Sequence, residues 1–486
     1  MSVTPSEIVL TAALKQLRAE HPLLGASKLH ALLCAGYAGW SVSEKRVRKV
    51  LQAEGLQLAP PPAKKGGDRG TSEGDAGKGV GDVGDVGGGG GGAVYPSSRV
   101  LDGLDVKKWT GKVEVRYFGK EKGKGLVATE TIEKGEVVWT EDPFIIAPEW
   151  DIYDLQQSSA TCTYCTTPLT YRADFSKTLP CPSTTSPSHF SSSSHSSTSP
   201  QACPARFCTR LCLTRSLTTH PLLCPAQNPA SIPFLEFARK TRWLAVHAVG
   251  VCASRILLAN EDKKSRDGNG RLEEEWRFVR SLAELGMEER VEKQAAFMGT
   301  AFPQPDRATW KHAHTLFVQA FRTPTTPQHQ KKLARILKTP LPDDIAAELF
   351  EYDAFLRSLG RMSLNLEAHG GLYTLHSHLN HSCSPNISVR HLGASTRTTP
   401  LSRISLIALR AIQPDEELVI TYVDPGMGVK ERRRELSAWG WGVCLCVRCV
   451  SEEGDEKEEG EGKTREGEAG GEADLEGELK AGLGVF

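Results

Sequence analysis

The chain has 486 residues, 39% hydrophobic and 24% charged, a composition typical of globular proteins large enough for several cores. Lys and Arg balance Asp and Glu at 59 each, but residues 451–486 carry 13 acidic and 4 basic side chains. A mildly basic body therefore precedes an acidic tail. The absence of an apolar run of 18 residues and of a secretory signal predicts no membrane partner and a cytosolic or nuclear protein.

Residues 1–57 are expected to form a small helical module. Val47, Val50 and Leu51 follow helical spacing, and Ser41 stands three residues before Glu44, as in a capping box. The helix that follows carries four basic residues, Lys45, Arg46, Arg48 and Lys49. Two interpretations remain open: a helix-turn-helix-like element that binds nucleic acid, or a docking module with a solvated basic face.

Residues 58–109 are predicted to be a Gly-rich linker. Strand-like runs follow at 113–118, 122–129 and 136–144, and others return at 404–410 and 417–422. Between them lie a Cys-rich segment, 160–226, and a helical segment, 230–360. The chain is therefore predicted to be α+β, with two groups of strands that meet across a long insertion.

The C-terminal cysteines predict a metal site. Cys444, Cys446 and Cys449 offer three thiolates within six residues, while tetrahedral zinc needs four ligands. Cys383, in the irregular stretch LNHSCSPN, is the candidate for the fourth. A redox pair or a chance cluster is the alternative.

A second group of cysteines supplies the ligands for two further zinc sites. Between residues 162 and 224 there are seven Cys and one His at ligand-like spacing: Cys162, Cys165, Cys181, Cys203, Cys208, Cys212, His220 and Cys224. A segment of this size needs metal to fold, because it buries little apolar surface. The remaining Cys34 and Cys252 are expected to be small buried residues.

The segment 160–226 resembles a MYND zinc finger. That resemblance implies interleaved ligands, with Cys162, Cys165, Cys208 and Cys212 on one zinc and Cys181, Cys203, His220 and Cys224 on the other. The chain departs from the pattern by a Ser/His-rich run of 21 residues between Cys181 and Cys203. His189 and His195, which lie in this run, are alternative ligands for the second zinc.

Four motifs in order, GKGL (123–126), LNHSCSPN (379–386), PDEELVITY (414–422) and CLCVRC (444–449), resemble those of the SET-and-MYND protein-lysine methyltransferases. The resemblance is greatest to the fungal members related to the yeast histone H4 lysine methyltransferase. It implies a SET domain of small β-sheets with a pseudoknot over 110–424, split by the MYND finger (160–226) and the helical insert (230–360). A post-SET zinc loop (425–450) and a disordered acidic tail (451–486) would follow.

The same resemblance implies S-adenosyl-L-methionine as cofactor, with three zinc ions. Tyr422 would be the catalytic residue and also contact the cofactor, and Tyr373 would line the lysine channel. The other cofactor contacts would be Gly123, Lys124, Gly125, Asn365, Asn380, His381 and Trp441, with Trp439 as an alternative to Trp441. Glycines would let the backbone approach the cofactor, and Lys124 would face its carboxylate. Asp415 stands where the family often has Gly, which predicts an altered turn.

Structural alternatives stay open for several of these residues. Asn380 and His381 could only stabilise their loop, and Tyr422 could only pack at a strand end. His376 and His378 have the spacing of a metal pair but are expected to be loop or surface residues.

The implied activity is S-adenosyl-L-methionine-dependent methylation of protein lysines, with the histone H4 tail as substrate, in chromatin regulation. The implied location is the nucleus, on chromatin, and the cytoplasm. The alternatives are methylation of non-histone proteins, or a zinc-dependent adaptor whose MYND finger binds Pro-rich peptides.

Overall fold

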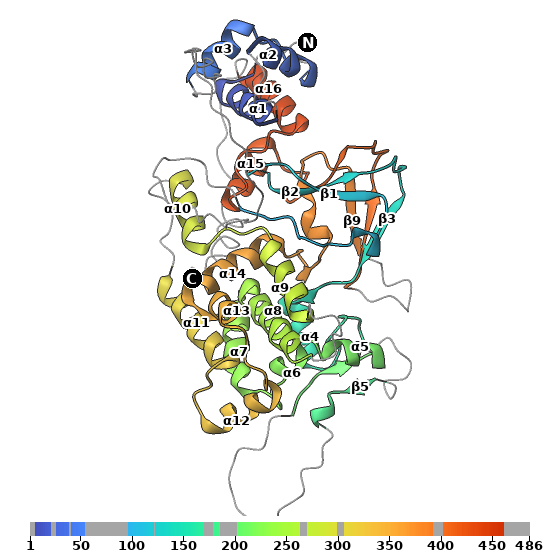
Figure 1. Ribbon diagram of the computed structural model, residues 1–486, viewed down its shortest axis with the longest axis vertical. Helices are drawn as coiled ribbons and strands as arrows, with labels where there is room; N and C mark the ends of the chain where they lie inside the picture. The colour runs from blue at the N-terminus through green and yellow to red at the C-terminus, as the bar shows by residue number, and fades with distance from the viewer. Residues whose placement is uncertain are drawn as a thin grey trace, which may run out of the picture. The chain divides into compact units, whose positions relative to one another are not determined.

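The computed structural model describes residues 5–20, 26–37, 40–53, 96–120, 122–169, 178–184, 202–262, 270–298, 306–391 and 402–460 (Figure 1). The chain divides into two compact units. The first comprises residues 1–94 and 449–464, and the second comprises residues 95–448 and 465–486. Within the described residues, no helix has the length and apolar character needed to cross a membrane.

Three helices form the N-terminal part of the first unit: α1 (Glu7–Glu20), α2 (Ala26–Gly36) and α3 (Glu44–Ala53). Their core contains Leu10, Leu14, Leu29, Leu33 and Val47, none of which exposes any surface. Residues 54–57 of the predicted module lie outside the described residues.

The start of α3 differs from the sequence expectation. Ser43, not Ser41, precedes the helix, and its hydroxyl accepts a hydrogen bond from Arg46 N at 3.4 Å. The side chain of Arg46 in turn donates to Pro5 O at 2.8 Å, so this basic residue helps to hold the unit together.

The second unit contains four small sheets. Their strands are β1 (Val113–Tyr117), β2 (Lys124–Ala128), β3 (Val137–Glu141), β4 (Ile145–Ile146), β5 (Leu179–Pro180), β6 (Arg206–Phe207), β7 (Gly371–Leu372), β8 (Asn380–His381), β9 (Ile387–His391), β10 (Ile404–Ala408) and β11 (Glu417–Ile420). The strand orders are β1-β2-β11-β8, β3-β10-β9, β4-β7 and β5-β6. Strands from both ends of the unit therefore share sheets, as the two groups of strand-like runs predict.

The four-stranded sheet brings three distant segments side by side. Strand β11 is antiparallel to β2, with Leu418 opposite Leu126, and parallel to β8, with Val419 opposite Asn380. Both leucines are fully buried in one core with Trp139 of β3, so burial fixes which face of the sheet points inward.

Helices make up much of the second unit. These helices are α4 (Trp150–Gln157), α5 (Arg210–Ser216), α6 (His220–Leu223), α7 (Ile232–Lys240), α8 (Leu244–Asn260), α9 (Arg271–Ser281), α10 (Met287–Met298), α11 (Arg307–Phe321), α12 (Pro327–Ile336), α13 (Asp343–Phe350), α14 (Tyr352–Asn365) and α15 (Val429–Ala438). Short 3₁₀ turns lie at Val106–Lys108, Pro182–Thr184, Pro229–Ser231 and His376–His378. Helix α8 is buried nearly all round and packs against α7, α9 and α14 (Figure 1).

Two predicted boundaries change. The predicted linker, 58–109, is described from residue 96 onward, and Ser97 there exchanges backbone hydrogen bonds of 2.8 and 2.7 Å with Glu284. The predicted disordered tail begins inside a helix instead, because α16 (Val447–Gly460) extends through its first residues. The remainder of both segments lies outside the described residues.

Candidate functional site

The Gly-x-Gly segment, strand β8 and strand β11 meet at Asn380. Its Nδ2 donates to Lys124 O at 3.0 Å and to Glu417 Oε1 at 2.9 Å. Sequence reasoning missed Glu417, although an acidic first residue in an otherwise apolar strand was a signal for it. The side chain of Asn386 is fully buried; it accepts from Val419 N and donates to Glu417 O, both at 2.8 Å.

Both glycines of the segment are required by contacts within the protein. Gly123 has φ +72°, and a Cβ there would lie 2.1 Å from Ser98 Oγ. A Cβ on Gly125 would lie 2.5 Å from a ring carbon of Phe118 and 2.8 Å from Asn380 Nδ2. Because Gly123 and Gly125 have no side chains, Ser98, Phe118 and Asn380 can pack closely against the strand. Close approach of the cofactor to this backbone stays a prediction.

Lys124 carries a buried ammonium group without a counter-ion. The residue is 3% exposed, and its Nζ has no hydrogen-bond partner among the described residues. Burial lowers the pKa of Lys124 to about 7. An unpaired buried cation is costly, so this position favours an anionic ligand group.

His378 lies near this lysine; of the expected loop or surface position, the loop is observed, in the 3₁₀ turn His376–His378, but the residue is not at the surface. It is 1% exposed, its Nδ1 hydrogen-bonds Thr374 O at 3.0 Å, and its Nε2 has no partner within the described part of the chain. Burial, followed by the charge of Lys124, lowers the pKa of His378 well below its ordinary value. The ring is therefore neutral.

His376 is also buried rather than at the surface. Its Nε2 lies 3.0 Å from Glu367 Oε1, and its backbone amide donates to Glu141 Oε2 at 3.1 Å. Although burial opposes it, the two carboxylates raise the pKa of His376. Glu367 lies only a short way before this turn in the chain, whereas Glu141 is 235 residues away, so only the local glutamate could have been found from the sequence of this segment.

Tyr422 and His381 are joined at the end of β11. Tyr422 N donates to His381 Nδ1 at 2.9 Å, so the other ring nitrogen, Nε2, carries the proton when the ring is neutral. Burial lowers the pKa of His381 to about 4, which keeps it neutral at pH 7. Its Nε2 lies 3.2 Å from Cys383 Sγ, the distance of an N–H···S hydrogen bond.

The phenol of Tyr422 is a protonated hydrogen-bond donor. Its hydroxyl donates to Leu379 O at 2.6 Å, and burial raises the pKa of Tyr422. The ring of Trp441 packs against it with centroids 5.2 Å apart. Trp439 instead lies under Arg290, 4.2 Å from its guanidinium carbon. Of the two tryptophans, Trp441 is therefore the one that the structure places beside Tyr422.

Asn365 and Tyr373 are engaged in contacts within the protein. Asn365 Oδ1 accepts from Ala283 N at 3.2 Å, and its Nδ2 donates to Ala283 O at 2.8 Å. Tyr373 exposes no surface, and its hydroxyl donates to Ser402 O at 2.5 Å. This burial differs from the expectation of a side chain that lines a channel, because the phenol ends on a backbone carbonyl inside the core.

Asp415 keeps a glycine-like turn rather than altering it. Its φ is +64°, in the left-handed region that glycine adopts most easily. Its carboxylate accepts from Arg116 Nη2 at 2.8 Å. The turn therefore leads into β11 along the path that glycine would give.

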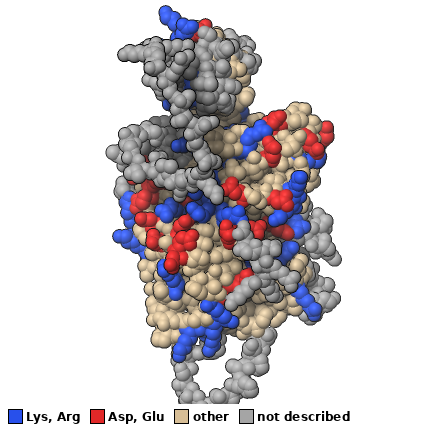
Figure 2. Space-filling model, in the orientation of Figure 1, with Lys and Arg blue, Asp and Glu red and all other residues tan. Residues whose placement is uncertain are grey.

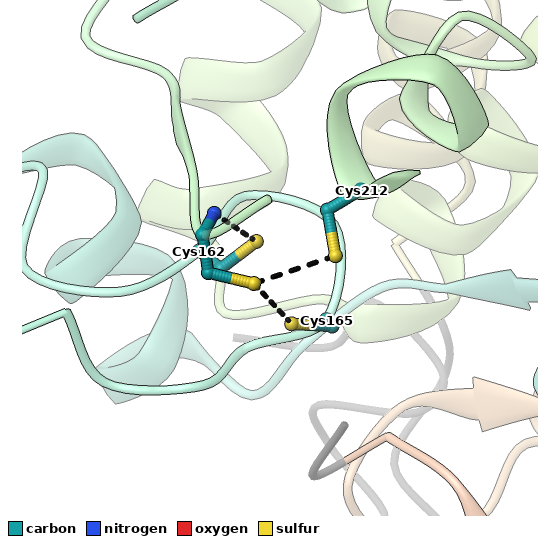
Figure 3. Close-up of side chains that lie close together, drawn as sticks. Cys162, Cys165 and Cys212 are labelled. Atoms are coloured by element: carbon teal, nitrogen blue, oxygen red, sulfur yellow. Dashed lines mark hydrogen bonds between the residues drawn. The ribbon is translucent and has the colours of Figure 1, made fainter. Parts of the chain in front are cut away.

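The first cysteine group has the spacing of a tetrahedral zinc site. The four sulfur atoms of Cys162, Cys165, Cys208 and Cys212 lie within 4.8 Å of one another, and Figure 3 shows three of these side chains converging. Cys208 Sγ lies 3.6 Å from Cys165 Sγ and 3.5 Å from Cys212 Sγ. Zinc–sulfur bonds of about 2.3 Å at tetrahedral angles would separate sulfurs by about 3.8 Å, which this group matches.

The second group contains Cys181, Cys203, His220 and Cys224, again within 4.8 Å. His220 Nε2 lies 3.4 Å from Cys181 Sγ and 3.5 Å from Cys203 Sγ. These are the two sets that the interleaved pattern predicts. The alternative ligands His189 and His195 lie outside the described residues.

The third group joins Cys383 to Cys444, Cys446 and Cys449 at the same mutual distance limit. Cys383 Sγ lies 3.9 Å from Cys444 Sγ, and Arg448 Nη1 donates to Cys383 O at 3.2 Å. All three groups could thus hold a metal ion. The leftover cysteines behave differently: Cys252 is 5% exposed in α8, whereas Cys34 is only half-buried, 3.5 Å from His30 Nε2.

The amino-acid sequence of the chain is similar to those of known fungal proteins. The chain is 29% identical over 356 residues to "Histone-lysine N-methyltransferase SET5" of Mycosarcoma maydis, covering 70% of this chain and 67% of that protein. It is 25% identical over 443 residues to the protein of the same name from Yarrowia lipolytica, covering 90% of this chain and 79% of that protein.

Among solved structures, "Crystal structure of the SET domain of LSMT bound to Lysine and AdoHcy" superposes with a TM-score of 0.30 and 10% identity. The alignment covers 67% of this chain and 52% of that one, so the chain spans about half the length of this structure. The stronger match is to the sequence model of the SET domain, which covers residues 123–423, well over half of the chain. The chain therefore belongs to the SET domain family.

Proposed function

We propose that the protein is an S-adenosyl-L-methionine-dependent protein-lysine N-methyltransferase that acts on histone tails. The observation that carries the proposal is the convergence of Lys124, Asn380 and Tyr422 at one edge of the β1-β2-β11-β8 sheet. The proteins of the same family compared above are named histone-lysine N-methyltransferases, which supports a histone substrate.

The residues around Lys124 suit the cofactor. S-adenosyl-L-methionine carries one carboxylate, and the unpartnered Nζ of Lys124 would be its counter-ion. The unpartnered Nε2 of His378 is a second polar group for the same end of the molecule. Asn380, His381 and the backbone of Gly123 and Gly125 complete the proposed contacts, with Trp441 beside the ring of Tyr422. When bound, the cofactor supplies an activated methyl group on a sulfonium.

Methyl transfer to an amine needs alignment and a neutral lysine more than it needs a general base. Tyr422 is suited to alignment because its hydroxyl is protonated and is held by Leu379 O. The hydrogen bond from Tyr422 N to His381 Nδ1 fixes the backbone that carries this phenol. The substrate lysine would lose its proton to solvent before transfer.

The three metal groups are proposed zinc sites. The sets around Cys162 and Cys181 would make a MYND finger, and the set around Cys383 would make a post-SET loop. In the third site, the N–H of His381 would donate to a zinc-bound thiolate, as outer hydrogen bonds commonly do around zinc. Zinc would thereby hold the segment that carries Asn380 and His381.

The charge distribution is compatible with a basic histone tail. Figure 2 shows acidic and basic side chains interspersed on the visible face of the second unit, without a field of one sign. Nuclear and chromatin-bound action would follow from such a substrate.

The test is transfer of a radiolabelled methyl group to core histones and to whole-cell lysate, with the modified residues mapped by mass spectrometry. The proposal expects labelled histone lysines and S-adenosyl-L-methionine binding by calorimetry. Labelling of other lysate proteins alone would keep the reaction and change the substrate. Full zinc content without cofactor binding or transfer would favour the adaptor that binds Pro-rich peptides.

A further inference from the structure

A cavity of about 310 Å³ lies between the segment 143–148, helices α4, α7 and α8, and the Cys/His group around Cys181. Helices α4, α6 and α8 approach one another in this region of Figure 1. None of the proposed cofactor residues lines the cavity, which therefore belongs to a different part of the second unit. Its volume is that of a small-molecule site.

The walls are largely apolar. Phe144, Ile145, Leu223, Leu235 and Val251 line the cavity from β4 and its flanks, α6, α7 and α8. Apolar walls around a space this large leave surface that the protein itself does not bury. A ligand with an apolar body would remove that surface from water.

Two of the polar side chains that line the cavity are neutral. His247 lines it from α8, is 4% exposed, and has no hydrogen-bond partner for Nδ1 among the described residues. Burial lowers the pKa of His247 to about 4 and raises the pKa of the neighbouring Tyr153 to about 12. The rings of the two residues lie 5.1 Å apart. The cavity thus offers an uncharged imidazole and a protonated phenol.

The charged residues at the cavity do not favour an anion. Arg255 Nη2 donates to Glu275 Oε1 at 2.8 Å, which offsets its charge, and its Nη1 donates to Phe144 O; only its Nε has no hydrogen-bond partner among the described residues. Glu236, which also lines the cavity, is exposed and would repel a carboxylate or phosphate. The chemistry of the lining therefore points to an uncharged ligand.

We propose that this cavity binds a compact, uncharged aromatic or aliphatic molecule with one hydrogen-bonding group, and that His247 recognises that group. An unsatisfied buried polar atom costs about 1–3 kcal/mol, so a ligand hydrogen bond to the imidazole favours a molecule with a donor over its hydrocarbon analogue. Because Cys203 and His220 also line the cavity, the ligand contacts the second metal group and α8 at once.

The test uses the full-length, zinc-loaded protein with phenol and toluene as probes, measured by saturation-transfer NMR titration. Phenol is expected to bind more tightly than toluene. Leu235→Trp fills the cavity from α7 and is expected to weaken both probes by about tenfold or more. Leu244→Trp is the matched control, because Leu244 is also half-buried and packs on the same helical core but does not line the cavity.

His247→Phe keeps the ring and removes the nitrogens. It is expected to weaken phenol by about tenfold while leaving toluene within about threefold of the wild type. Zinc content and circular dichroism verify that each variant is folded. Failure of both probes to bind, equal binding by Leu235→Trp and Leu244→Trp, or equal losses for phenol and toluene in His247→Phe would each overturn the proposal.

Discussion

The imidazole ring of His381 links the backbone amide of Tyr422, which follows strand β11, to the sulfur of Cys383. Tyr422 N lies 2.9 Å from His381 Nδ1, and His381 Nε2 lies 3.2 Å from Cys383 Sγ. One ring thereby joins the proposed catalytic tyrosine to a proposed zinc ligand. A substitution at Tyr422 or at Cys383 is therefore expected to affect the other residue. The substitutions Tyr422→Phe and Cys383→Ser distinguish the two roles.

Tyr422→Phe removes the hydroxyl and leaves the hydrogen bond from the backbone amide to His381. Methyl transfer is expected to fall by about 10²-fold or more, because the positioned hydroxyl is lost. The zinc content should stay at its wild-type value. Measurement combines transfer of radiolabelled methyl groups with zinc analysis, and unchanged transfer would reject the catalytic role of Tyr422.

Cys383→Ser is expected to lower zinc content by one equivalent and to impair methyl transfer as well. Serine is a poor zinc ligand, and the loss removes the acceptor of the His381 N–H. Cys34→Ser is the control, since Cys34 belongs to none of the three metal groups. Full zinc stoichiometry in Cys383→Ser, measured by mass spectrometry of the metal, would contradict the proposed joint role.

Lys124 predicts a pH dependence of stability. Its pKa is about 7 in the folded protein and about 10.5 in the unfolded chain, so the unfolded state binds more protons between these values. Stability from this group should therefore rise with pH from about 7 to about 10.5. Lys124→Met should remove this rise and stabilise the cofactor-free protein near pH 7 by up to roughly 4–5 kcal/mol.

Cofactor binding should raise the pKa of Lys124 again. A carboxylate beside Nζ favours the charged amine, so binding at pH 8–9 should take up a proton. Calorimetry in two buffers of different ionisation enthalpy measures that uptake, and Lys124→Met should abolish it. Equal apparent enthalpies in both buffers for the wild type would show that Lys124 does not face the cofactor.

Asp142 joins the Cys-rich segment 160–226 to the start of strand β10. Its carboxylate accepts from Arg403 Nε and Nη2 at 2.8 and 2.7 Å and from Arg215 of α5 at 3.2 Å. Although burial opposes it, these arginines lower the pKa of Asp142. A double-mutant cycle with Asp142→Asn and Arg403→Gln should give a coupling of about 1 kcal/mol or more in urea unfolding. Additive effects would mean that the pair does not contribute.

The sequence predicted elements whose signals are local. Strands β1, β2, β3, β10 and β11 fall within the predicted runs, because alternating apolar residues and turn glycines mark them. The resemblance to a MYND finger implied the two interleaved Cys/His groups, and the spacing of Cys444, Cys446 and Cys449 predicted a third group with Cys383; the structure brings all three together.

Features that depend on distant partners were not predictable. His376 was expected to be a loop or surface residue, and its burial depends in part on Glu141, 235 residues away, whose carboxylate accepts from its backbone amide. The burial of Lys124 likewise depends on a distant segment, because Asn380, 256 residues away, packs against its strand and donates to its carbonyl. The burial of Tyr373 was not predictable for the same reason, since its hydroxyl donates to the carbonyl of Ser402, 29 residues later in the chain.

The pairing of β2 with β11 and β8 has a consequence for the order in which the protein forms. Asn380 is 256 residues from Lys124, so β2 leaves the ribosome long before its partner β11 and the neighbouring strand β8 are synthesised. At about 5–20 residues per second, synthesis of the intervening chain takes roughly 10–50 seconds. During that interval the chain already contains every residue of the two Cys/His groups between residues 162 and 224. It also contains most of the residues that form the helical core around α8. The Cys-rich segment 160–226 and the helices can therefore fold first, while β2 has only β1 to pair with until strand β11 is synthesised.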